Sequence, residues 1–337
     1  MKIPWRLAKQ IPVYLRDMYR VKRGKRPKKA LDTVLHITMN CNLRCEYCYI
    51  ARDKKLFPNK YKESGLPQED IKKILDNIKR NSMTVTFFGG EPFVRKDLTE
   101  LVRYAKEEIK IPMVNITTNG TLLKKKKNAL QYIDMLGVSY DQTRIHQYPK
   151  KMKTMLMDLE ELSRTGYTKN VTFDVTMKHD DHIEELFPFF EYCKHNDFKV
   201  FLQPVRYDNN VYEWEAYKKQ FKTVFKRYGD SMITNNDKTV INLDADYIQE
   251  NCVPNIKYII DVNGQLIYPC ERFSYQKVGS TISKDIGQLY NQAEKEIGRF
   301  PNKKCGECGM QCYTEVATIY RKPSFLLSKA YHQIFNK

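Results

Sequence analysis

The sequence predicts an α/β fold in which parallel strands alternate with helices. Three observations support this fold class. Six short apolar segments between residues 31 and 204 are typical of buried strands, helical spacing of apolar residues fills the intervals between them, and polar residues follow the strand ends. Units of this kind join parallel strands by right-handed crossovers and place their active sites at the carboxyl ends of the strands.

The expected strands are rich in Val, Ile, Leu and Phe, and polar or glycine-containing turns bound them. They are Leu31–Thr38, Thr84–Phe88, Met113–Thr117, Val138–Tyr140, Val171–Met177 and Lys199–Pro204. Each strand except the last precedes a segment that is typical of an amphipathic helix. These helices are expected at Gln68–Arg80, Asp97–Lys110, Lys127–Leu136, Lys151–Thr165 and Ile183–His195.

The pattern changes after Pro204. Helices are expected at Tyr212–Tyr228 and Lys284–Ile297, whereas the polar segment 235–250 has no clear assignment. Asn263-Gly264 separates two apolar segments and predicts the turn of a β-hairpin. The resulting divisions are a basic amphipathic N-terminal arm (1–30), the strand–helix region (31–204), a helical connector (205–250), a cysteine-rich domain (251–315) and an amphipathic C-terminal tail (316–337).

The charge is concentrated at the N-terminus. Residues 1–29 contain eleven Lys or Arg and one acid, Asp17, and so carry a formal charge of +10 out of +18 for the whole chain. Apolar residues such as Trp5, Ile11 and Leu15 lie between these charges. The arm fits an anionic membrane surface, nucleic acid phosphates or a solvated tail packed against the body, and we rank nucleic acid lowest.

The mean hydropathy of −0.62 and the absence of an apolar stretch of membrane-spanning length predict a cytoplasmic protein, with peripheral membrane attachment as an alternative. Eight of the nine cysteines fall into clusters, which in such a protein favours metal binding over disulfides. Cys193 stands alone on an apolar helix face and is interpreted as a buried structural thiol.

Three of the clustered cysteines, Cys41, Cys45 and Cys48, follow the first strand with CxxxCxxC spacing. Three thiolates can hold a cubane cluster and leave one iron open, whereas structural zinc needs a fourth ligand. The loop resembles the signature of the radical S-adenosylmethionine (SAM) superfamily. That resemblance implies a partial (β/α)6 TIM-like barrel with a small C-terminal cysteine-rich auxiliary-cluster domain, a [4Fe–4S] cluster, SAM, and a reducing partner such as flavodoxin or ferredoxin.

The resemblance also implies residues that bind SAM. Tyr47 corresponds to the aromatic residue near the adenine, and Gly89-Gly90-Glu91-Pro92 resembles the motif that binds the methionine amino group. Residues at the ends of the third and fourth strands resemble positions that contact the ribose and the methionine carboxylate; these are Thr118, Asn119, Ser139 and Asp141. Asp174, Thr176, Gln203 and Pro204 are expected to face either the nucleoside or the substrate.

The later cysteines resemble the auxiliary-cluster domains called SPASM and twitch. They are Cys252, Cys270, Cys305, Cys308 and Cys312. Five thiols suit one auxiliary [4Fe–4S] cluster with one cysteine to spare, and a zinc site is the alternative.

The sequence therefore predicts an enzyme that cleaves SAM reductively and abstracts a hydrogen atom from an unidentified substrate. A peptide, a protein or a membrane-associated lipid is the expected substrate class. The alternatives are a non-catalytic iron–sulfur carrier or scaffold and a radical SAM enzyme that modifies RNA. The Gly89–Pro92 segment argues against the carrier, since a carrier needs no nucleoside pocket.

Overall fold

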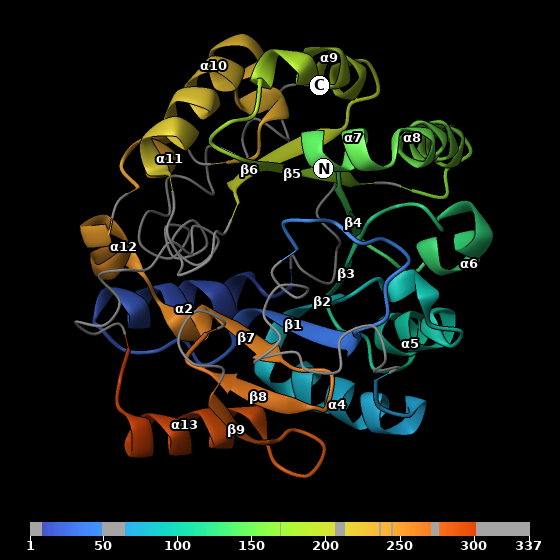
Figure 1. Cartoon of the computed structure of the whole chain (residues 1–337). Coiled ribbons are helices and arrows are strands. Elements are labelled where there is room, and N and C mark those ends of the chain that lie inside the picture. Colours follow the sequence, from blue (N-terminus) through green and yellow to red (C-terminus); the bar gives the residue numbers. More distant parts are fainter. Residues whose placement is uncertain are drawn as a thin grey trace.

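A computed structural model describes residues 9–48, 65–168, 170–205, 213–235, 237–243, 245–270 and 276–300. Its centre is a sheet of six parallel strands in the order β6-β5-β4-β3-β2-β1, with helices packed along it (Figure 1). The strands are β1 (Ala30–Thr38), β2 (Ser82–Gly89), β3 (Met113–Thr118), β4 (Met135–Ser139), β5 (Val171–Met177) and β6 (Lys199–Pro204). The predicted fold class is confirmed: the sheet is that of a partial barrel, and it is not closed.

The helices cover one face of this sheet. They are α4 (Gln68–Asn81), α5 (Leu98–Arg103), α6 (Lys127–Leu130), α7 (Gln142–Gln147), α8 (Pro149–Arg164) and α9 (Phe187–His195). On β5, Val171, Phe173 and Val175 are buried in the same apolar core as the inner faces of the helices. Because strand side chains alternate between faces, Asp174 and Thr176 point away from the helices, into the interior of the barrel.

Two predicted helices differ from the structure. The segment expected to be helical from Lys127 forms only the four-residue α6, and β4 already begins at Met135. The Asp134 carboxylate accepts the Val114 N–H at 2.8 Å and the Lys106 ammonium at 2.6 Å, which ties this segment to the start of β3. The other long helix, expected over 97–110, is α5 followed by a π-helical turn, Tyr104–Glu108.

The C-terminal strands extend the barrel sheet. β7 (Lys257–Ile260) pairs in parallel with the free edge of β1, and β8 (Gln265–Tyr268) and β9 (Gln276–Ser280) follow in antiparallel order. The predicted hairpin turn is confirmed, because the Asp261 carboxylate accepts the N–H groups of Asn263 and Gln265 at 2.9 and 2.8 Å. β9 was not predicted, since its sequence QKVGS lacks a strong strand pattern.

The remaining described helices connect and brace these strands. They are α2 (Ile11–Lys22), α10 (Trp214–Met232), α11 (Asp237–Ile241), α12 (Ala245–Asn251) and α13 (Ile286–Ile297). One buried amide, Asn77 of α4, donates to the carbonyls of Thr281 and Lys284 and accepts the Ile286 N–H. Through these bonds the start of α13 is tied to the barrel. Of the helices in the described ranges, none is long and apolar enough to cross a membrane.

Candidate active site

The first cysteine loop lies at the carboxyl end of β1. Cys45 is buried, and Cys41 and Cys48 are half-buried. Burial raises the pKa of the Cys41 and Cys45 thiols, and the neighbouring thiols raise it further. The thiols of Cys41 and Cys45 therefore favour the charged form only when cations compensate them, as the irons of a cluster do. Among the described residues, no three Cys, His or carboxylate side chains are placed to hold a single metal ion.

The glycine pair after β2 packs directly against the backbone that leads into this loop. The Gly90 N–H donates to the Thr38 carbonyl, and the Glu91 N–H donates to the Asn40 carbonyl, both at 2.8 Å. A Cβ on Gly90 would lie 2.4 Å from the Asn40 oxygen, and a Cβ on Gly89 would lie 2.1 Å from the Thr38 oxygen. Both contacts are too short for any side chain, so only glycine permits this close approach.

Glu91 is fully buried beside the cysteine loop. Its carboxylate accepts the Phe93 N–H at 3.0 Å, the Thr118 hydroxyl at 2.7 Å and the Asn119 N–H at 2.7 Å. Burial raises the pKa of Glu91, and these hydrogen bonds oppose the rise. Glu91 therefore fastens the end of β2 to the end of β3.

Asn119 continues this connection to the cysteines. Its Nδ2 donates to the Asn42 Oδ1 at 2.9 Å and lies 3.9 Å from the Cys41 Sγ. The structure thus brings Cys41, Glu91, Thr118 and Asn119 together. Buried Pro92 begins the 3₁₀ turn that follows. Their role as SAM-binding residues stays a prediction.

The end of β4 reaches the same loop from the other side. The Tyr47 hydroxyl donates to the Asp141 Oδ2 at 2.5 Å. Asp141 caps α7 by accepting the Arg144 N–H at 2.9 Å, and the Arg144 guanidinium pairs with its carboxylate and contacts the Tyr47 hydroxyl. Ser139 is half-buried at the strand end, where it pairs with Asp174 in the sheet.

Arg144 was not among the predicted site residues. Its guanidinium lies 5.3 Å from the centre of the Tyr47 ring, and its charge opposes the rise in the pKa of Cys45 that burial causes. Its Nε is buried and has no hydrogen-bond acceptor in the described part of the chain. A signal was available: a basic residue three positions after an N-cap Asp lies one helical turn away, on the same side.

The barrel interior is polar. Gly137 of β4 leaves room on this face, because a Cβ there would lie 3.0 Å from the Asp174 Oδ2 and 3.3 Å from the Thr117 Oγ1. The buried Asn115 side chain, on the same face of β3, has an Oδ1 with no donor among the described residues. Desolvation raises the pKa of Asp174 to about 7, against the opposing charges of Arg144 and Lys257.

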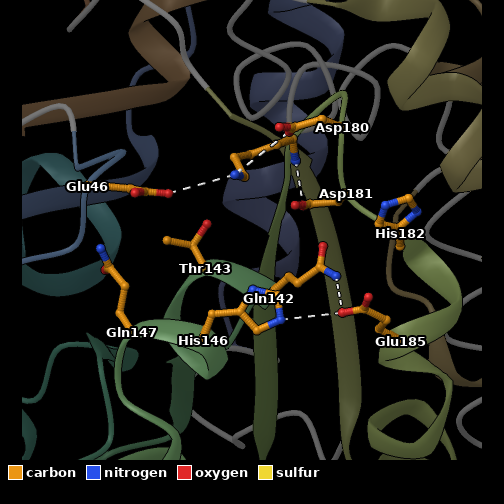
Figure 2. A pocket seen from close by; sticks show the side chains of 10 residues that line it. Glu46, Gln142, Thr143, His146, Gln147, Asp180, Asp181, His182 and Glu185 are labelled. Atoms are coloured by element: carbon orange, nitrogen blue, oxygen red, sulfur yellow. Dashed lines mark hydrogen bonds and ion pairs between the residues drawn. The ribbon is translucent and has the colours of Figure 1, made fainter.

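A recess of about 370 Å³ opens beside the cysteine loop, between α7 and the residues that follow β5 (Figure 2). The Lys178 ammonium bridges Glu46 and Asp180 at 3.7 and 3.8 Å across it. Burial raises the pKa of Asp181 to about 6. The lining residues are Glu46, Gln142, Thr143, His146, Gln147, Lys178, Asp180, Asp181, His182 and Glu185.

The second cysteine set is described only in part. Cys252 and Cys270 contact one small apolar cluster that includes Val34 of β1 and Phe88 of β2, so they lie near each other beside the barrel sheet. Cys305, Cys308 and Cys312 lie outside the described residues. Cys193 lies on the buried face of α9 and is fully buried in the core, as expected of a structural thiol.

Residues 35–153 match the family model of the Radical SAM superfamily. The chain carries a radical SAM domain. This is the domain of enzymes that use a [4Fe–4S] cluster and SAM in radical reactions, and it spans β1 to the start of α8, where the cysteine loop, Glu91 and Asp141 lie. The SPASM or twitch assignment and the auxiliary cluster stay predictions.

Curated relatives match mainly this domain. The chain is 29% identical over 199 residues to a GTP 3′,8-cyclase from Limosilactobacillus fermentum, which covers 57% of this chain and 59% of the relative. It is 34% identical over 112 residues to the S-adenosylmethionine-dependent nucleotide dehydratase RSAD2 of Danio rerio, which covers 32% of this chain and 29% of the relative. The chain thus spans about three fifths, or less, of these relatives.

Solved structures share the fold over most of the chain. SuiB from Streptococcus suis, bound to S-adenosylmethionine, has a TM-score of 0.63 at 18% identity and covers 91% of this chain and 78% of its own. The anSMEcpe structure with bound AdoMet has a TM-score of 0.57 at 15% identity and covers 89% and 95%. At these identities the likeness concerns the fold alone.

Proposed function

We propose that this protein is a radical SAM enzyme whose cluster is held by Cys41, Cys45 and Cys48. One observation carries the proposal: the cysteine loop is joined by hydrogen bonds to the carboxyl ends of both β3 and β4, through Asn119 and through Tyr47. An iron–sulfur carrier needs only the thiols. The buried carboxylate and the arginine beside them are the groups that a charged amino-acid ligand requires.

Each neighbouring residue has a part in this proposal. Glu91 fixes the positions of the Gly89 and Gly90 carbonyls and of Asn119 relative to Cys41. These carbonyls are then in place to accept hydrogen bonds from the methionine amino group. Arg144 supplies the positive charge for the methionine carboxylate, and its Nε, which has no acceptor among the described residues, can donate to that carboxylate. When bound, the cluster supplies the electron that breaks the sulfonium C–S bond and yields a 5′-deoxyadenosyl radical.

The C-terminal region is proposed to hold one auxiliary [4Fe–4S] cluster. Cys252 and Cys270 already share one apolar cluster beside the barrel, and Cys305, Cys308 and Cys312 provide the further thiols. Such a site next to β1 and β7 is within reach of a substrate in the barrel. The electron for SAM cleavage is proposed to come from a flavodoxin or ferredoxin.

The barrel interior bears on the substrate class. Asp174, Thr117 and Asn115 present a carboxyl, a hydroxyl and an amide to the same space, and burying such groups against an apolar chain is costly. This lining suits a polar substrate moiety with hydrogen-bond donors, as in a peptide, and does not suit an isoprenoid tail. A lipid substrate would have to present its head group here.

The test is anaerobic incubation of the reconstituted protein with SAM and dithionite, with 5′-deoxyadenosine measured by mass spectrometry. The wild-type chain and the Cys193→Ala variant are expected to produce it, and Cys45→Ala is not. Cys193 is the matched control, because it is a buried thiol in the core away from the loop.

The outcomes separate the alternatives. An intact cluster without 5′-deoxyadenosine would overturn the enzyme and leave the carrier. Production by Cys45→Ala would show that another cysteine set holds the cluster. Two [4Fe–4S] clusters should give about eight iron atoms per chain. About four iron atoms together with bound zinc would mean that the C-terminal cysteines bind zinc.

A further inference from the structure

Helix α2 presents apolar side chains to solvent on one stripe. Ile11, Leu15 and Tyr19 are 54%, 48% and 55% exposed, and at a spacing of four residues they lie along one side of the helix. Three other large apolar side chains in the described part of the chain are exposed, at 63%, 43% and 37%, and they lie on three separate elements: α8, α11 and α13.

A neighbouring side of α2 is anchored to the body of the protein. Tyr14, Met18 and Val21 pack with Leu31, Val253 and Ile256 in a small cluster. Asp17 is fully buried, accepts the Lys29 N–H at 3.1 Å and pairs with Arg16 at 3.1 Å. The helix is therefore held in one orientation, and the stripe is not the face that packs on the protein.

Basic residues surround the stripe. Lys22 and Arg23 at the end of the helix and Lys25 just beyond it are exposed, and the Arg23 guanidinium lies 4.3 Å from the centre of the Tyr19 ring. Residues 1–29 together carry a formal charge of +10. An apolar stripe within a basic surface is the pattern of helices that lie in the interface of an anionic bilayer.

We propose that the Ile11-Leu15-Tyr19 face of α2 docks the protein on an anionic phospholipid surface. A second copy is a poor occupant, because it would bring two strongly basic segments together. RNA would meet the charges and leave the apolar stripe in water. This proposal is independent of the radical chemistry.

The orientation is compatible with an active enzyme. α2 packs on Leu31, near the start of β1, whereas the cysteine loop follows the other end of that strand (Figure 1). Helix α2 and the cysteine loop therefore lie toward opposite ends of β1.

The test is flotation of the full chain with vesicles of phosphatidylcholine alone or with added phosphatidylserine. Binding is expected only with phosphatidylserine and is expected to weaken with salt. The double variant Ile11→Gln/Leu15→Gln should bind at least about tenfold more weakly. Met157→Gln, a matched change at a 63% exposed apolar residue on α8, should bind like the wild type.

Charge is tested separately with Lys22→Gln, Arg23→Gln and Lys25→Gln combined, which should weaken binding on the order of a hundredfold. The control variant replaces three exposed lysines elsewhere, Lys150, Lys153 and Lys222, with glutamine. This variant should bind the vesicles almost as well as the wild type. The proposal is overturned if vesicles do not bind, if both triple variants weaken binding equally, or if the stripe variant binds fully. Salt-sensitive RNA binding without vesicle binding would assign the surface to RNA.

Discussion

The two cysteine-bearing regions are held in place by different means. The first loop is attached to its surroundings by hydrogen bonds at the strand ends. The buried Glu91 carboxylate accepts the Asn119 N–H, and the Asp141 carboxylate caps α7. In the second set, Cys252 precedes β7 and Cys270 follows β8, and these strands extend the sheet beyond β1. Asn77 ties the segment that comes after them to the barrel, through the carbonyls of Thr281 and Lys284. The comparison teaches that the first site is fastened to the barrel's own strand ends, whereas the second lies beside strands added to the edge of the barrel.

The largest expected difference is between Cys45→Ala and Cys270→Ala. The first removes a ligand of the SAM-binding cluster and should abolish 5′-deoxyadenosine formation. The second should retain that reaction and lose about four iron atoms per chain. Iron analysis and product formation on the same preparations check both, and loss of SAM cleavage in Cys270→Ala would mean that the regions are not separable.

Next in size is the effect of Asn77→Ala. Thr281, Lys284 and Ile286 would lose their side-chain partner, which should lower the free energy of unfolding by about 3 kcal/mol. Hydrogen exchange should increase over 281–286 and much less at the barrel strands. Asn128→Ala, at an exposed asparagine, is the control, and equal loosening of both regions would contradict the anchor.

Glu91→Gln probes the other region. An amide at the position of Oε2 would place a donor against the Asn119 N–H, at a cost of about 2 kcal/mol. SAM cleavage should fall while the exchange of 281–286 stays normal. Glu108→Gln, at a surface ion pair, should cost less than about 0.5 kcal/mol. A normal denaturation midpoint for Glu91→Gln would show that this carboxylate does not join the strand ends.

The effect that is smallest within any one pH unit concerns Asp174. Its pKa is about 7 in the fold, above the usual 3.8, so the folded state holds a proton that the unfolded chain has released. Its contribution to stability is therefore lost as the pH rises from about 4 to 7. Relative to the wild type, the free energy of unfolding of the Asp174→Asn variant should rise by about 1 kcal/mol for each pH unit across this window. Parallel thermal melting curves would contradict this assignment.

Much of the barrel was predictable because its signals are local. Val171–Met177 and Lys199–Pro204 were predicted with the bounds that the structure has, since alternating or continuous apolar residues mark buried strands. The prediction of a helix over 127–136 was wrong, because the Asp134 carboxylate accepts the N–H of Val114, which lies twenty positions earlier in the chain. β9 was missed because its sheet partner, and not its own sequence, makes it a strand.

The sequence by itself determined the cysteine loop, the glycine pair and the alternation of strands and helices, because each depends on neighbours within a few residues. Only the tertiary structure decided that Asp141 and Arg144 meet Tyr47 of the cysteine loop, that Asn77 ties α13 to the barrel and that β7 pairs with β1. The same holds for the stripe on α2, since which side of an amphipathic helix is covered depends on what packs against it. These features rest on contacts between distant segments, and such contacts exist only once the chain has folded.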